Sequence, residues 1–139
     1  MIGIDTNVLL RHLTMDDPAQ ASLARRAIDG FDAANPGHVS VIVLCELVWV
    51  LERAFRRSRE EIAVAIQVLL HTRHLLFEDF EVVEAALTRY RRGRVGFSDT
   101  LLGLRNRMAG CEATLTFDRD AAAQAEFRLL TATGVQEMR

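Results

Sequence analysis

Carboxylates follow two short apolar stretches of this chain. Asp5 comes directly after Ile2–Ile4, and Asp118 comes directly after Ala113–Phe117. Each stretch has the length and composition of a short β-strand. In parallel α/β sheets, ligands bind beyond the carboxyl ends of the strands, so both residues are candidates for a binding or catalytic site. Taken alone, Asp118 could equally well begin a turn.

A third acid, Glu46, is the only charged residue in the apolar segment 39–51. An ionised carboxylate in apolar surroundings is costly unless it is paired or bound to a metal ion. Its neighbours one helical turn later are both apolar, so we interpret Glu46 as a functional residue. The alternative is that Glu46 lies on a solvent-facing stripe of its helix, in line with Glu52 or Arg53.

The fourth acid, Asp99, follows Ser98, which we expect to cap a helix. Acids in the first turn of a helix commonly complement the helix dipole, so Asp99 alone also has an ordinary structural explanation. Considered together, two of the four acids close strands, and two lie in helices that we expect to follow strands. All four can therefore meet at the carboxyl edge of one parallel sheet.

Such a cluster of acids indicates a metal site. Four neighbouring carboxylates repel one another, which raises their pKa values unless a cation binds between them. Ligands that are all oxygen favour hard divalent ions, so we expect magnesium or manganese. The histidines show neither a metal-site spacing nor a cysteine partner, and we interpret them as structural or surface residues: His12, His38, His71 and His74.

Short apolar runs alternate with segments of helical periodicity along the chain. We expect strands at Ile2–Asp5, His38–Val41, Leu75–Phe77, Ala113–Phe117 and Arg128–Thr131. The helix signals are Asp17 before Pro18, a capping box at Ser58–Glu61 and a stop at Gly110. Strands that alternate with helices indicate a parallel sheet covered on both faces, so the expected fold class is α/β.

Length and composition set limits on the kind of protein. The chain has 139 residues, and we expect a single domain over residues 1–139. No apolar run approaches the roughly 18 residues that cross a bilayer, so no membrane partner is expected. No basic region precedes a hydrophobic signal core, which favours a cytoplasmic protein. Cys45 and Cys111 form no Cys-x-x-Cys motif, and we expect reduced, buried thiols.

All 17 basic residues are arginine, and arginine offers a planar fork suited to phosphate. Two clusters stand out: Arg89, Arg91, Arg92 and Arg94 before Asp99, and Arg53, Arg56, Arg57 and Arg59 earlier in the chain. We expect the first cluster to hold an RNA backbone, although either could be an ordinary solvated helix face. Phe97 and Tyr90 are the only nearby aromatic residues that could stack on a base.

These segments together resemble the four motifs of PIN-domain ribonucleases. The motifs here are Ile4–Leu10, the isolated Glu46, Phe97–Leu102 and Leu115–Asp120. Their order, spacing and total length are similar to those of the VapC-type toxins of bacterial toxin–antitoxin pairs. The resemblance covers essentially the whole chain. Gly103 stands where relatives often carry Ala, and we expect this difference to be harmless for packing.

The resemblance implies a three-layer α/β/α sandwich around a short, mostly parallel five-stranded sheet. It also implies a divalent-metal-dependent endoribonuclease, using magnesium or manganese, that acts as the toxin of a toxin–antitoxin pair. The catalytic and metal-binding acids would be Asp5, Glu46, Asp99 and Asp118. The supporting residues would be Thr6, Asn7, Thr116 and Asp120, the last of which could share or replace the role of Asp118.

Protein partners are expected as well. The resemblance implies a cognate antitoxin that blocks the site, and a homodimer. Several helices look apolar over a wide arc, notably around Val48, Trp49, Ile66 and Leu70, and such a surface indicates an interface.

Three other functions are less well supported by the residues. A receiver domain or small phosphatase normally uses a lysine, and the chain has none. A nucleotide-binding P-loop would need a glycine-rich Gly-Lys-Ser/Thr run, which is also missing. A catalytically inactive PIN fold that only binds RNA or a protein remains the main alternative, and the complete set of four acids argues against it.

Overall fold

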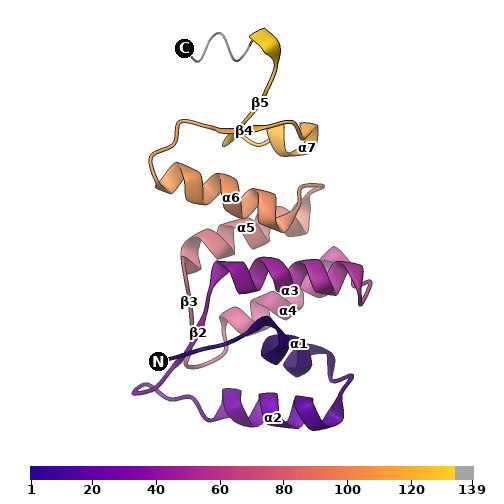
Figure 1. The fold of residues 1–139 in the computed structure, drawn as a ribbon, viewed down its shortest axis with the longest axis vertical. Coiled ribbons are helices and arrows are strands. Elements are labelled where there is room, and N and C mark those ends of the chain that lie inside the picture. Colours follow the sequence, from indigo (N-terminus) through magenta and orange to yellow (C-terminus); the bar gives the residue numbers. More distant parts are fainter. Residues whose placement is uncertain (134–139) are drawn as a thin grey trace. The chain divides into compact units, whose positions relative to one another are not determined.

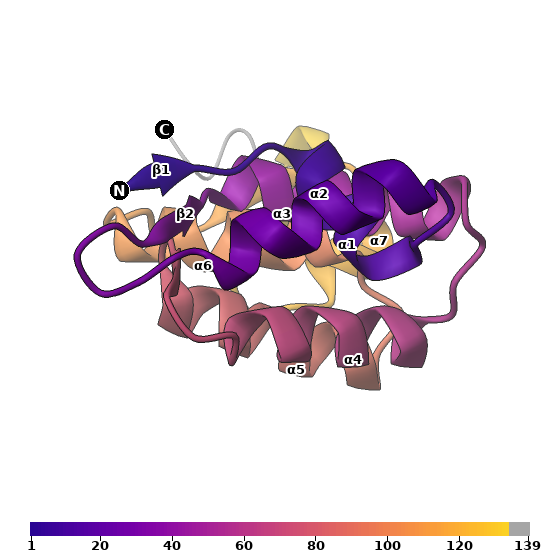
Figure 2. The same cartoon turned by 90° about the horizontal axis from the view of Figure 1, so that it is seen from below.

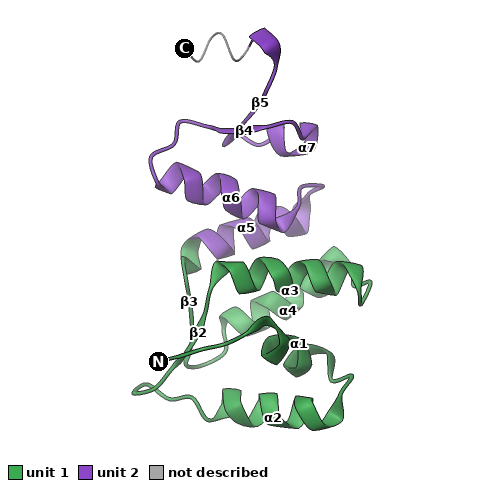
Figure 3. Cartoon of the chain, viewed as in Figure 1, with its two compact units in different colours: residues 1–81 green, residues 82–139 purple. Residues whose placement is uncertain are grey.

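The computed structural model describes residues 1–133. The chain divides into two compact units, Met1–Glu81 and Val82–Arg139 (Figures 1 and 3). We call them unit 1 and unit 2 and describe each by itself. The expected single domain over residues 1–139 stays a prediction, and its last residues, 134–139, lie outside the described part.

Unit 1 is built around three parallel strands in the order β1-β2-β3, with β1 and β2 visible side by side in Figure 2. The strands are very short: β1 (Ile2–Gly3), β2 (Gly37–Val39) and β3 (Leu75–Phe77). The helices of the unit are α1 (Thr6–Thr14), α2 (Pro18–Asp29), α3 (Val41–Arg53) and α4 (Arg59–Leu70). Helix α1 packs against α2 and α3, and α4 packs against α3 and β3.

The starts of the unit 1 helices agree with the sequence signals. Asp17 caps α2 by accepting a hydrogen bond from the backbone of Gln20, with Pro18 at the first helical position. Ser58 and Glu61 form the expected reciprocal capping box of α4. The core of the unit consists of fully buried aliphatic side chains from the strands and helices, including Leu9, Val39, Leu44, Leu47, Ile62, Ile66 and Leu69.

Unit 2 begins at Val82, within the first turn of α5 (Phe80–Arg92). Its further elements are α6 (Phe97–Met108), β4 (Thr114–Thr116), α7 (Arg119–Ala122) and β5 (Phe127–Leu129). Strands β4 and β5 pair in parallel. Tyr90 of α5 and Phe97 of α6 are both fully buried and meet edge to face, with ring centroids 6.1 Å apart. Gly110 follows α6 with a φ of +97°, which agrees with the expected helix stop.

The α/β class with short parallel strands is therefore confirmed, and one detail differs from expectation. The described residues form a three-stranded and a two-stranded sheet instead of one hydrogen-bonded sheet of five strands. The strands are two or three residues long, so each ladder has few hydrogen bonds with which to extend a sheet. Among residues 1–133, no helix is long and apolar enough to cross a membrane.

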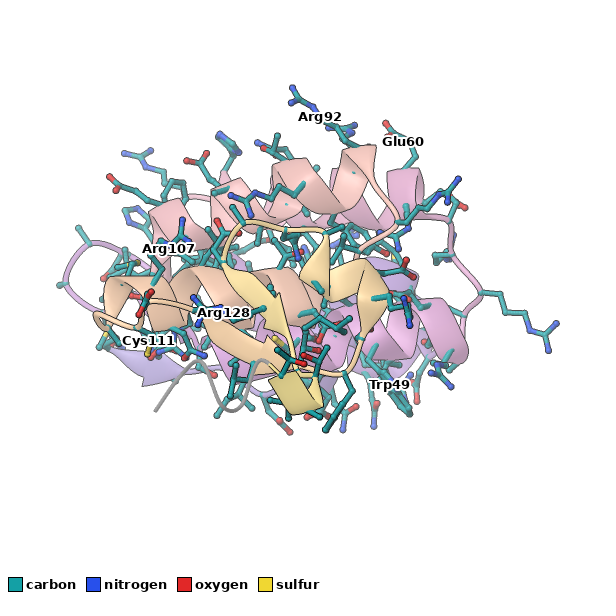
Figure 4. The ribbon with its side chains drawn as sticks, turned by 90° about the horizontal axis from the view of Figure 1, so that it is seen from above. Trp49, Glu60, Arg92, Arg107, Cys111 and Arg128 are labelled. Atoms are coloured by element: carbon teal, nitrogen blue, oxygen red, sulfur yellow. The ribbon has the colours of Figure 1, made fainter. Side chains whose placement is uncertain are left out.

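The cysteines are partly as expected. Neither Cys45 nor Cys111 forms a disulfide among residues 1–133, and Cys45 is half-buried. Cys111 is exposed, however, because it lies in the turn after α6 and its apolar neighbours do not cover it (Figure 4). The expectation of two buried thiols is therefore wrong for Cys111.

Gly103 is more constrained than its sequence context indicates. It is buried in α6, and a Cβ at this position would overlap the ring of Phe127 and lie 3.2 Å from the Cβ of Glu126. We expect Gly103→Ala to lower the free energy of unfolding by about 1–3 kcal/mol through overpacking, after the modest gain in helix propensity. Urea denaturation would measure this loss.

The matched control for Gly103→Ala replaces Phe127, whose ring the added methyl group would overlap, with the smaller Leu. Phe127→Leu alone should be destabilising, but in combination with Gly103→Ala it should cost less than the sum of the two single changes. Strictly additive losses would contradict the proposed contact.

Candidate active site

Asp5 lies just beyond β1 and starts the first helix of unit 1. It is the N-cap of α1, where its Oδ1 accepts a hydrogen bond from the backbone N–H of Thr6 at 2.8 Å. The side chain is exposed. The structure therefore places Asp5 at a strand tip, as expected, with its carboxylate open to a ligand.

The two neighbours of Asp5 in the motif behave differently from each other. Thr6 is only 2% exposed, and its Oγ1 has no hydrogen-bond partner among the described residues. Asn7 is exposed and lines a cavity of about 360 Å³ beside α1 and α2. Within residues 1–133, Asn7 makes no hydrogen bond to Asp5, so an orienting role for Asn7 stays a prediction.

Glu46 lies in α3, and its side chain is exposed. The buried face of this helix is formed by Leu44, Leu47, Val48 and Leu51, while Ile42 and Trp49 are exposed together with Glu46. The solvent-facing stripe contains these two large apolar side chains, which made Glu46 look buried in the sequence, and it continues into the exposed Glu52 and Arg53, as the alternative interpretation had it. The argument from the cost of burying its charge is wrong, and its role rests on the motif alone.

Most of the residues expected to form an apolar interface are used inside the protein instead. Val48, Ile66 and Leu70 are core residues, while Trp49 is 57% exposed and lies under the guanidinium of Arg53, 5.6 Å from the ring centroid (Figure 4). The two residues form a cation–π contact on the surface of α3.

Asp99 lies in the first turn of α6, but Ser98 does not cap this helix. The helix begins at Phe97, its N-cap is Gly96, and no side chain caps it. The α6 helix also follows α5 through a loop without an intervening strand. Burial of Phe97 explains the earlier start, because its ring packs on Tyr90 and draws the first turn into the core.

Within unit 2, the charge of Asp118 acts on the carboxyl group of Asp99. Asp99 is half-buried, and this desolvation raises the pKa of its carboxyl group. The nearby negative charge of Asp118 raises the pKa of Asp99 further. The carboxyl group of Asp99 therefore lies within electrostatic range of Asp118 in unit 2.

Asp118 is fixed by the start of α7. Its Oδ1 accepts hydrogen bonds from the backbone N–H groups of Asp120 and Ala121, at 2.8 and 3.3 Å. The hydroxyl of Thr116 in turn accepts a hydrogen bond from the backbone N–H of Asp118 at 3.0 Å. Asp120 is exposed in the first turn of α7, and Asp118 is the acid that repels Asp99.

The four arginines of the cluster before Asp99 differ in their surroundings. Arg89 makes two parallel hydrogen bonds to Glu126, from Nη1 to Oε2 at 2.7 Å and from Nη2 to Oε1 at 2.8 Å. Arg91 and Arg94 are exposed, and each interacts with other groups of the protein. Arg92 is exposed, and Figure 4 shows its side chain extending away from α5.

The aromatic residues near the site differ from the expected ones. Tyr90 and Phe97 are buried in the core of unit 2 and cannot stack on a base. The exposed ring beside the acids belongs instead to Phe117, which is 80% exposed and directly precedes Asp118. Strand alternation could have indicated this, since Thr114 and Thr116 share one face of β4 and Phe117 lies on the other.

Glu126 and Gln124 were missed by reasoning from the sequence. Glu126 is 4% exposed, and the hydrogen bonds from Arg89 hold the pKa of its carboxyl below the usual value despite burial. Gln124 accepts hydrogen bonds from Thr100 and Arg89. Neither residue belongs to a motif, and only their packing reveals them.

The four acids are thus divided between the units, with Asp5 and Glu46 in unit 1 and Asp99 and Asp118 in unit 2. Among residues 1–133, no three or more His, Cys, Asp or Glu side chains are grouped closely enough to hold a metal ion. The Asp99–Asp118 pair nevertheless fits part of a site for a hard divalent cation. Its donors are carboxylate oxygens, and a cation would relieve their repulsion.

Comparison with known proteins identifies the class. The PIN domain family matches residues 2–127, nearly the whole chain, and the protein belongs to this family. PIN domains are typically nucleases, so the family places this chain among the enzymes that hydrolyse nucleic acids. No curated protein matches the chain.

Proposed function

We propose that this PIN-domain protein is a divalent-metal-dependent endoribonuclease whose acidic residues are Asp5, Glu46, Asp99 and Asp118. The observation that supports it best is the Asp99–Asp118 pair. A half-buried carboxylate next to a second one is unfavourable in the isolated protein, and a bound cation would remove the penalty. Perturbed carboxylates of this kind are typical of functional sites.

The four acids would hold magnesium or manganese, with Thr6, Asn7, Thr116 and Asp120 as supporting residues. A bound divalent cation would polarise the phosphate and lower the pKa of a bound water. The protein's own contribution is to hold the carboxylates in place. Thr116 and the first turn of α7 do this for Asp118, and the backbone of Thr6 does it for Asp5.

The substrate would be held through its phosphates. Of the four arginines proposed for RNA binding, Arg92 is the best placed, because it is exposed and extended, whereas Arg89 is already bonded to Glu126 (Figure 4). Arg91 and Arg94 are exposed as well. Arginine contacts to phosphate give binding that weakens steeply with salt, through release of counterions.

The biological role that we propose is that of a cytoplasmic toxin paired with an antitoxin protein, acting as a homodimer. Support comes from the order, spacing and length of the motifs, which are similar to those of VapC-type toxins. An adjacent gene for a small DNA-binding protein would favour this role. Copurification of that protein with the nuclease, and inhibition by it, would test the role directly.

Cleavage of a mixed-sequence RNA with and without EDTA tests the proposed activity. We expect cleavage in millimolar magnesium, none in EDTA, and recovery when manganese is added. Asp5→Asn should remain folded and lose cleavage by a factor on the order of 10²–10³, the loss typical of one electrostatic contact to a transition state. The melting temperature of the unchanged protein should also rise with added magnesium.

The same experiment separates the enzyme from a PIN fold that only binds. A binding-only protein would retain RNA in EDTA and in Asp5→Asn, and would show no cleavage with either metal. Cleavage that persists in EDTA would contradict the metal dependence while leaving the nuclease assignment intact.

A further inference from the structure

We propose that Gln124 is a positioning residue that fixes the turn carrying Asp99 against the segment carrying Asp118. The inference rests on the proposed function, because it assigns Gln124 a role in holding two of its acids. All the contacts involved lie within unit 2.

The side-chain amide of Gln124 joins two helices to the segment between α7 and β5. Its Oε1 accepts hydrogen bonds from Oγ1 of Thr100 at 3.2 Å and from Nη1 of Arg89 at 3.3 Å. A guanidinium can only donate, so Arg89 determines which end of the amide faces inward. The Gln124 oxygen is therefore fixed toward α6.

The Thr100 hydroxyl links Gln124 to the turn that contains Asp99. Thr100 is 1% exposed and directly follows Asp99 in the first turn of α6. Its Oγ1 also lies 3.0 Å from the backbone carbonyl of Gly96, so its single proton is shared between the helix start and Gln124. The α6 helix has no side-chain cap, which leaves the Gln124 contact as an added restraint on this turn.

Gln124 is also connected to Asp118, because only the very short helix α7 lies between them in the chain. Asp118 is the N-cap of α7, which ends at Ala122, and the backbone N–H of Gln124 donates to the carbonyl of Ala121 at 3.0 Å. One hydrogen bond from Thr100 to Gln124 therefore restrains the separation of Asp99 and Asp118.

The fold does not depend on this bond. The segment is held more firmly by Glu126, which pairs with Arg89, and by Arg107, which donates to the carbonyl of Ala125 at 3.1 Å. Moreover, the Nε2 of Gln124 is buried with no hydrogen-bond partner among residues 1–133. Burying a donor in this way is costly, so stability alone would favour an apolar side chain here.

The test replaces Gln124 with Met, which has a similar length and no strong acceptor. The primary measurement is the affinity of the full chain for Mn²⁺, followed by electron paramagnetic resonance without RNA. We expect Gln124→Met to weaken Mn²⁺ binding about tenfold, the effect typical of residues that orient metal ligands. Its melting temperature should stay within about 3 °C of the unchanged protein.

Variants at Thr100 keep the inference testable if Gln124→Met does not fold. Thr100→Val should weaken Mn²⁺ binding to a similar degree, and Thr100→Ser, which keeps the hydroxyl, should bind as the unchanged protein does. If the two residues act through one hydrogen bond, the double variant Thr100→Val with Gln124→Met should bind Mn²⁺ no more weakly than the single variant that has the lower affinity. With RNA, kcat should fall while KM stays the same.

Asn106→Ala is the matched control. Asn106 donates to Oγ1 of Thr114 at 3.0 Å, so it also connects α6 to the β4–β5 layer, but from the opposite end of α6. It should leave Mn²⁺ binding and kcat unchanged. Equal losses in Asn106→Ala, or unchanged Mn²⁺ affinity in both Gln124→Met and Thr100→Val, would overturn the inference. Failure of the unchanged protein to bind Mn²⁺ would overturn the proposed metal site as well.

Discussion

Replacing Asp99 with Asn is expected to slow RNA cleavage strongly and, at the same time, to raise the stability of the protein without metal. Burial, and then repulsion from Asp118, raise the pKa of Asp99 in the folded state. The folded protein therefore binds this proton more tightly than the unfolded chain, and the ionised group is destabilising at neutral pH. Asn removes that charge. Cleavage should fall by a factor on the order of 10²–10³.

The pH dependence gives the clearest measurement of the stability effect. For a raised carboxyl pKa, the destabilisation is present above the folded pKa and disappears once the group is protonated in both states. Thermal melts of Asp99→Asn and the unchanged protein should therefore differ at pH 7 and converge in acid, below about pH 4. Glu112→Gln, which removes one exposed charge from unit 2, is the control and should change neither cleavage nor the melting temperature. A less stable Asp99→Asn at pH 7 would contradict the proposed carboxylate pair.

The sequence could predict the class of fold because its local signals agree with one another. Asp17 with Pro18, Ser58 with Glu61, and Gly110 each act within a few residues, and each lies at the helix end that it indicated. Capping depends on short-range hydrogen bonds, so it can be recognised without knowing the tertiary structure.

Predictions that depend on which face of a helix is covered were less successful. Glu46 looked buried because the exposed stripe of α3 contains Ile42 and Trp49, and composition alone cannot show which side meets solvent. Ser98 looked like a cap, but packing of Phe97 on Tyr90 moves the start of α6 to Phe97. In both cases, tertiary contacts decide between alternatives that are nearly equal locally.

Residues that act through distant partners were missed entirely. Gly103 was expected to be neutral, yet the ring of Phe127 occupies the space that a side chain would need. Glu126 carries no motif, and its importance comes from Arg89, which lies in α5, far earlier in the sequence. Such pairs become visible only when two segments far apart in the sequence are known to touch.

The second large effect concerns Arg89, which we expect to stabilise unit 2 instead of binding RNA. Arg89→Ala should lower the free energy of unfolding by about 3 kcal/mol, because the carboxylate of Glu126 would be left buried without its bidentate partner. Arg107 lies 3.9 Å from Glu126 and compensates only in part. Chemical denaturation at pH 7 would measure the loss.

The reciprocal change, Glu126→Gln, should lower the stability less than Arg89→Ala does. This difference between the two variants distinguishes a buried ion pair from a surface ion pair. Glu126→Gln keeps an acceptor and leaves an arginine whose side chain is 41% exposed and can be hydrated. Arg89 holds the pKa of Glu126 below its usual value, so the pair contributes stability above the unfolded pKa and loses it as the pH falls through the folded pKa. The difference between Arg89→Ala and the unchanged protein should therefore shrink in acid.

Arg92→Ala is the comparison that separates stability from RNA binding in this cluster. Arg92 is exposed, so its removal should change the free energy of unfolding by less than about 0.5 kcal/mol. RNA affinity should nevertheless fall, and the slope of log affinity against log salt concentration should become shallower by about the contribution of one phosphate contact. Equal stability losses in the two variants would contradict the structural role of Arg89. An unchanged salt slope in Arg92→Ala would instead remove Arg92 from the RNA-binding surface, and would leave the exposed Arg91 and Arg94 as the candidates for phosphate contact.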